Sequence, residues 1–121
     1  MEETTYNLEE RTAQFSENIV IAIKQCKKDQ LIFPVLSQLL RASTSIGANY
    51  CEANGASSRK DFINKIHICK KEAKETEYWL RVASNAVPEA SEQWGTLKKE
   101  AHELTLIFSK IAVSARQGIK N

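Results

Sequence analysis

The chain has 121 residues, of which 42% are hydrophobic and 26% charged, a balance typical of one soluble domain rather than of a disordered segment. The formal net charge of +2 is too small to indicate nucleic-acid binding by itself, and three cysteines without a CxxC pair argue against a disulfide framework or a zinc knuckle. We expect reduced thiols in a cytoplasmic protein, with no signal peptide at its acidic start and no apolar run long enough to cross a membrane.

Apolar residues recur at steps of three and four along four segments, which is the period of an amphipathic helix. The predicted helices cover about residues 7–28, 32–53, 58–86 and 90–117. The connections between them are short, and short connections force neighbouring helices to be antiparallel. The expected fold class is therefore all-α, with a single up-down-up-down four-helix bundle over residues 1–121.

Capping residues indicate where the helices begin and end. We expect Asn7 to cap the first helix and Ser58 to cap the third, with Asp61 as its partner three residues later. Gly55, a residue free to take a positive φ, should end the second helix, and Gly118 should end the fourth. Cations that complement the helix dipole are predicted in the last turn of the first helix: Lys24, Lys27 and Lys28.

The apolar seams predict the core. They consist of Leu8, Thr12, Phe15, Ile19, Ala22 and Cys26; then Leu36, Leu39, Leu40, Ala42, Ile46, Tyr50 and Ala53; then Phe62, Ile66, Cys69, Ala73, Thr76, Leu80 and Ala83; and finally Trp94, Leu97, Ala101, Leu104, Phe108, Ile111 and Ala115. Gly47 lies inside the second helix, where it costs about 1 kcal/mol against alanine. We therefore expect another helix to cross closely at Gly47.

Motifs for bundle chemistry do not occur. A di-iron site needs Glu-x-x-His, but Asn64 precedes His67 and Lys99 precedes His102 at that spacing. A CxxCH haem site, a Gly-rich phosphate loop, GxSxG and HExxH are also missing. The two histidines are expected at the surface or its boundary, and Cys69 as a small core residue. We predict no enzymatic activity, no metal, no cofactor and no small-molecule substrate.

The third helix carries basic residues beside its apolar seam. Lys60, His67, Lys74 and Arg81 recur every seven residues, which is nearly two helical turns, and Arg59, Lys70 and Lys71 lie close by. Residues 31–86 hold eight bases and five acids, whereas residues 1–30 hold four bases and six acids. The candidate contacts to a phosphate backbone, called the basic stripe below, are Lys60, Lys70, Lys71, Lys74 and Arg81. The alternative is a solvated face whose lysines pair with Glu72, Glu75 and Glu77.

The second helix has polar groups within its broad apolar face: Ser43, Ser45 and Asn49, with Arg41 and Glu52 at the margins. Buried polar groups need partners. One interpretation is a site for a ligand or partner. The other is a structural network between the second and third helices, with Glu52 paired to Arg59. We prefer the network. Tyr78, Trp79 and Trp94 add aromatic surface, which together with this apolar face suggests self-association.

Several spaced motifs resemble one known family. They are QLLRASTSIGAN at residues 38–49, EA at 52–53, SRKDF at 58–62, KEAKET at 71–76 and YWL at 78–80. Together they resemble the bacterial four-helix-bundle family named after reading frames in intervening sequences of 23S ribosomal RNA genes. The specific match covers roughly residues 31–86, and the other helices match in pattern.

The resemblance implies an assembly of five identical subunits and no known catalytic residues. It also implies kinship with the accessory variability protein of diversity-generating retroelements, a basic pentamer that binds nucleic acid and a reverse transcriptase. The positions that match the family motif are expected to be structural: Arg41, Asn49, Glu52, Arg59 and Phe62. Two functions follow as hypotheses: a module that binds RNA or DNA, or assists a reverse transcriptase; alternatively, a protein-interaction scaffold without a nucleic-acid role.

Overall fold

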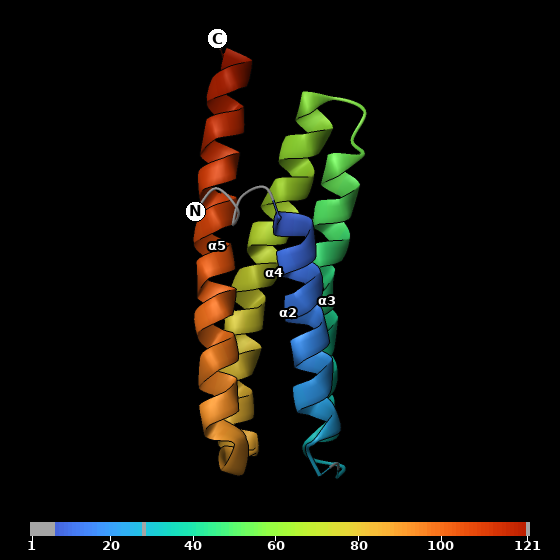
Figure 1. Ribbon diagram of the computed structural model, residues 1–121, viewed down its shortest axis with the longest axis vertical. Helices are drawn as coiled ribbons and strands as arrows, with labels where there is room; N and C mark the ends of the chain where they lie inside the picture. Colours follow the sequence, from blue (N-terminus) through green and yellow to red (C-terminus); the bar gives the residue numbers. More distant parts are fainter. Residues whose placement is uncertain (1–6, 28, 121) are drawn as a thin grey trace.

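A computed structural model of the chain describes residues 7–27 and 29–120, with the side chains of 119 and 120 excepted. Its elements are α2 (Leu8–Lys24), α3 (Phe33–Asn54), α4 (Arg59–Ala86), a short 3-10 helix η1 (Pro88–Ala90) and α5 (Ser91–Lys120). The four long helices alternate in direction along the long axis of the molecule (Figure 1). This is the predicted all-α, four-helix architecture. The acidic start of the chain and Lys28 lie outside the described residues.

The core forms from the predicted seams. Every predicted seam residue of α2, with Cys26 just after it, is buried, and so are those of α4 from Ile66 to Ala83. Trp94, Leu104 and Phe108 of α5 are fully buried as well, and Trp94 Nε1 donates to the carbonyl oxygen of Val87 at 3.1 Å. Leu40 differs from the prediction, since 38% of its surface is exposed.

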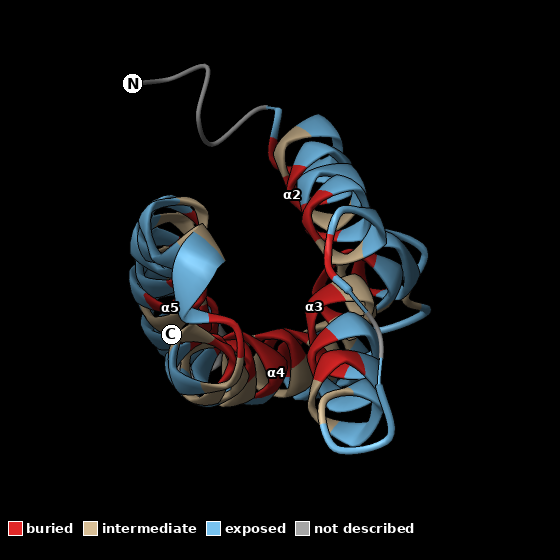
Figure 2. Cartoon of the chain, turned by 90° about the horizontal axis from the view of Figure 1, so that it is seen from below, coloured by how far each residue is buried: buried red, intermediate tan, exposed pale blue. Residues whose placement is uncertain are grey.

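The helices lie side by side in the order α2, α3, α4 and α5, and viewed along their axes they follow an arc with α2 and α5 at its two ends (Figure 2). Side chains make contact across this arc. The rings of Tyr50 in α3 and Phe108 in α5 have centroids 5.8 Å apart. Arg11 of α2 donates two hydrogen bonds to Glu100 of α5, at 2.6 and 2.9 Å.

Gly47 lies where α2 crosses α3. A Cβ atom at this position would be 3.1 Å from Oγ1 and 3.3 Å from Cβ of Thr12, a residue that is itself buried. The close helix crossing predicted from the sequence is therefore confirmed. It explains why this helix contains a glycine despite its poor helix propensity.

Helix ends were predicted less accurately than helix cores. Ser58 does cap α4, because its Oγ accepts from Asp61 N–H at 3.0 Å. Asn7 occupies the N-cap position of α2 but its side chain makes no capping bond. Gly55 has φ of −99° rather than a positive value, since the turn after α3 closes through its N–H bond to Glu52. Gly118 lies inside α5 rather than ending it.

The end of α2 also differs from the prediction. Gln25 and Cys26 donate to carbonyl oxygens three residues earlier, at 3.3 and 3.0 Å. Such bonds tighten the chain and end the α-helix. Only Lys24 lies in the last turn of α2, and Lys27 lies beyond it.

Candidate nucleic-acid interface

The basic stripe runs along the surface of α4, the helix that packs between α3 and α5 (Figure 2). Lys60, Lys71, Lys74 and Arg81 are exposed and Lys70 is half-buried. Within residues 7–27 and 29–120, no carboxylate forms an ion pair with any of the five. The stripe therefore places five cations on one helix without a neighbouring anion bound to them.

Two glutamates on α4 face α3 instead of the stripe. Glu72, which is buried, accepts from Arg41 Nη1 at 3.4 Å. Glu75 pairs with Arg41 Nη2 and also accepts from Trp79 Nε1 at 3.0 Å. Arg41 thus ties α3 to α4. Neither glutamate neutralises a lysine of the stripe.

The third glutamate of α4 faces α5. Glu77 accepts from Thr105 Oγ1 at 2.8 Å and lies 3.3 Å from Nδ1 of His102. His102 is exposed and His67 half-buried, so both histidines are at the surface or its boundary, as predicted. The helical ion pairs expected for a solvated face, between the stripe lysines and these three glutamates, do not form among the described residues.

A sixth basic group beside the stripe comes from α5. Nη2 of Arg116 lies 2.7 Å from Nε2 of His67, and both residues line a pocket that also includes Lys70. No sequence pattern predicted a role for Arg116. Its partner His67 is a member of the seven-residue pattern, but pairing the two residues requires the register between antiparallel helices, which periodicity does not supply.

The polar groups within α3 are satisfied mostly inside their own helix. Ser43 donates to Leu40 O at 3.2 Å, and Asn49 Nδ2 to Ser45 O at 2.8 Å. Ser45 donates to Arg41 O at 2.7 Å. These bonds leave no buried side-chain polar atom without a partner among the described residues, which argues against a ligand site. They lie within α3 and so differ from the predicted network between the two helices, to which Arg41 and Glu52 contribute instead.

The remaining motif positions are placed as follows. Glu52 pairs with Lys65 Nζ at 2.5 Å, so the predicted pairing with Arg59 is wrong. Arg59 reaches α5 instead, since a Cβ atom at Gly118 would lie 3.2 Å from its Nη1. Phe62 is partly buried and packs against the core.

The predicted aromatic surface is smaller than expected. Trp94 is fully buried and adds no surface. Trp79 is half-buried, and Tyr78, which is 57% exposed, stacks edge-on against it with ring centroids 5.0 Å apart. The most exposed large apolar side chains are Leu31 at 84% and Phe33 at 60%, beside the connection between α2 and α3.

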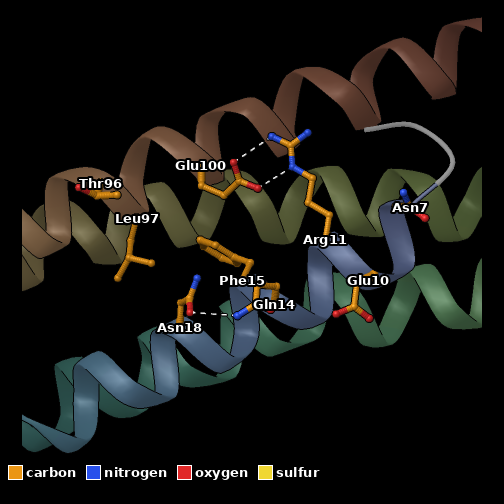
Figure 3. Close-up of a pocket in the computed structure, with 9 residues that line it drawn as sticks. All are labelled: Asn7, Glu10, Arg11, Gln14, Phe15, Asn18, Thr96, Leu97 and Glu100. Atoms are coloured by element: carbon orange, nitrogen blue, oxygen red, sulfur yellow. Dashed lines mark hydrogen bonds and ion pairs between the residues drawn. The ribbon is translucent and has the colours of Figure 1, made fainter. Parts of the chain in front are cut away.

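A second hollow lies between α2 and α5. Figure 3 shows Phe15 and Leu97 between the two helices, Arg11 of α2 joined to Glu100 of α5, and Gln14 joined to Asn18 along α2. The hydrogen bond to Glu100 raises the pKa of the Arg11 guanidinium above its ordinary value, so Arg11 stays charged. Its charge is matched by Glu100, which makes this hollow a poor site for an anion.

The thiol of Cys69 is not activated. Cys69 is buried with Sγ 3.5 Å from Ile46 O, and burial raises the pKa of this thiol to about 12. Cys51 is exposed. No cluster of three or more His, Cys, Asp or Glu residues in the described part of the chain could hold a metal ion. Among the same residues, none of the helices has the length and hydropathy to span a membrane.

Comparison with known proteins supplies a family. The model of the family described as 23S rRNA-intervening sequence protein matches residues 5–110. A solved crystal structure of a protein of unknown function, from the S23 ribosomal protein family of Bacteroides thetaiotaomicron, is 38% identical to this chain. The match covers 86% of this chain and 96% of that protein, with a TM-score of 0.78. No curated protein matches the chain.

Proposed function

Because the chain belongs to the 23S rRNA-intervening sequence protein family, we propose that it is a non-enzymatic protein that binds nucleic acid through the basic stripe of α4. One observation carries this proposal: Glu72, Glu75 and Glu77, the acids that lie between Lys71 and Arg81 in sequence, are bound to α3, Trp79 and α5. Their engagement leaves the lysines available for phosphate groups. A reduced, uncharged Cys69 also supports a protein without a cysteine nucleophile.

The ligand best suited to this surface is a phosphate backbone. Lys and Arg side chains neutralise phosphates and release counterions, without reading sequence. A net charge of +2 makes a single chain a weak binder. We propose that the chain forms a homo-oligomer of five subunits, in which the stripe is repeated and weak contacts add up. A reverse transcriptase is the partner protein that the family resemblance implies for such an assembly.

A gel-shift titration with a structured RNA hairpin tests the function. The parent should shift the RNA at about 50 mM salt and lose most of that affinity at about 200 mM. The variant Lys70→Glu with Lys74→Glu should fold and assemble normally. Its slope of log affinity against log salt should fall by about two, because each lost phosphate contact removes about 0.9.

A matched control distinguishes the effect of the stripe on RNA affinity from the effect of net charge. Lys24→Glu with Lys27→Glu changes the charge of the chain equally, at exposed positions near the end of α2. This control should keep most of the RNA affinity. If both double variants weaken binding equally, the stripe is a solvated face and net charge alone governs binding.

The alternative function is a protein-interaction scaffold with no nucleic-acid role. It is favoured by the exposure of Leu31 and Phe33, which are apolar side chains suited to a protein partner. The two functions differ in one outcome of the titration. If the parent shifts no RNA at about 50 mM salt, the scaffold replaces the nucleic-acid module.

A further inference from the structure

The pocket between α4 and α5 is lined by apolar groups and by polar side chains that can donate hydrogen bonds. His67 and Lys70 of α4 face Arg116 of α5, and the hydroxyl of Ser109 and the amide of Gln117 complete the polar lining. All five side chains can donate hydrogen bonds, and no carboxylate lines the pocket. The hollow between α2 and α5 differs, because Glu10 and Glu100 stand in its walls beside Arg11.

The contact between Arg116 and His67 fixes the guanidinium at this pocket. A guanidinium only donates, so Nε2 of His67 must accept at the observed 2.7 Å, with the ring proton on Nδ1. One of the five guanidinium N–H groups is thereby used, and no ion pair with a carboxylate is formed by Arg116 among residues 7–27 and 29–120. The other guanidinium N–H groups of Arg116 have no carboxylate partner among the described residues.

We infer that this pocket binds one phosphate group, with Arg116 as the bidentate donor and Lys70 as the second fixed positive charge. A planar guanidinium matches two phosphate oxygens, and an ammonium acts as a point charge beside them. Ser109 and Gln117 can donate to the other oxygens. The inference rests on the proposed function for the source of the phosphate, since Lys70 joins the pocket to the basic stripe and so places it on the path of a nucleic-acid backbone.

Inorganic phosphate tests the pocket directly by NMR. The chain has two histidines, so His102, which is exposed and bound to Glu77, is an internal reference for the imidazole signals of His67. Phosphate added to the full-length protein at constant pH should shift the His67 signals saturably and leave those of His102 in place. Sodium chloride at matched ionic strength should not reproduce the shift, and if it does, the pocket is no phosphate site.

Variants then test the assigned donor. Arg116→Gln should weaken phosphate binding about tenfold, the usual loss for a hydrogen bond to a charged group. Lys110→Gln removes the same charge at an exposed position of α5 that does not line the pocket, and it should change the affinity less than about twofold. Equal affinities of Arg116→Gln and the parent would overturn the inference.

RNA binding by the same variants separates this inference from the proposed function. If the RNA backbone is the source, Arg116→Gln should lower the salt slope by about 0.9, as expected for one lost phosphate contact. An RNA shift that is weakened by Lys74→Glu alone but not by Arg116→Gln would keep the proposed function and refute the RNA backbone as the source of the phosphate. Binding of phosphate without any RNA shift would keep the pocket, refute the proposed function and identify free phosphate as the ligand.

Discussion

Among single side chains, Arg41 has the most consequential position, because it holds two glutamates of α4 away from the basic stripe. The Glu72 side chain is only 11% exposed, whereas the Arg41 side chain is 46% exposed. Replacing Arg41 by Met should lower the free energy of unfolding by about 1 kcal/mol, since a half-exposed pair is partly screened by water. Urea unfolding followed by circular dichroism would measure the loss.

A double-mutant cycle checks that the loss comes from the ion pair. Glu72→Gln removes the charge that Arg41 neutralises, so adding it to Arg41→Met should recover part of the stability. The control is the same cycle with Glu52→Gln in place of Glu72→Gln, because Glu52 pairs with Lys65 between the same two helices. This control should show no coupling to Arg41→Met. Additive effects of Arg41→Met and Glu72→Gln would mean that the pair contributes nothing to folding.

The sequence correctly predicted most of the residues that are buried in the core, but it did not predict which charged residues pair with one another. Cys69 continues an apolar seam, which predicts a core position, and it is fully buried. Glu52 and Arg59 flank one turn, which predicts a pair, yet Lys65 is the partner of Glu52, six residues further along α4. Arg116 was missed for the same reason. Charge partners depend on the register and rotation of packed helices, which hydrophobic periodicity leaves open.

At the scale of helices, the close crossing of α2 and α3 limits the size of the side chain that position 47 can hold. Thr12 Oγ1, which would lie 3.1 Å from a Cβ atom added there, already bonds Leu8 O at 2.9 Å and so has little freedom to move. Gly95 in α5 has nothing within 4 Å of such a Cβ. Gly95→Ala should therefore stabilise the protein by up to about 1 kcal/mol through helix propensity, while Gly47→Ala should destabilise it.

Thermal unfolding of the two alanine variants provides the comparison. Both substitutions add one methyl group inside a helix, so their difference reports only the surroundings of that group. An equal rise in melting temperature for both would show that Thr12 yields to the added methyl and that the crossing is loosely packed.

Whole helices were more predictable than their ends. Long apolar seams predicted all four helices, because a stripe at the helical period must be buried in one core. Asn7 has a side chain suited to capping but makes no cap bond, and Gly118 continues α5 although glycine often ends helices. End signals are single local preferences of about 1 kcal/mol, which is too small to fix a helix boundary by itself.

For the whole molecule, the arc of helices separates two kinds of surface. The basic stripe belongs to α4, which lies inside the arc rather than at its ends (Figure 2). Among the described residues, the most exposed large apolar side chains are Leu31, in the α2–α3 connection, and Phe33, at the start of α3. A protein partner and a phosphate backbone therefore need not compete for one face. Subunits joined through the apolar end would keep their stripes accessible, as binding by a repeated weak surface requires.

The proposed assembly of five subunits gives the last prediction. Light scattering coupled to size exclusion should give a mass of five times the 13.7 kDa of the chain. Leu31→Ser with Phe33→Ser should lower that mass, because each buried side chain of this size contributes about 1.5–3 kcal/mol to an interface. Tyr78→Ser removes a side chain of similar exposure, 57%, from α4 and should leave the mass unchanged. A parent that stays monomeric at high micromolar concentration would refute self-association. If Tyr78→Ser dissociates the assembly and the double variant does not, the interface lies on α4, where it would cover part of the basic stripe.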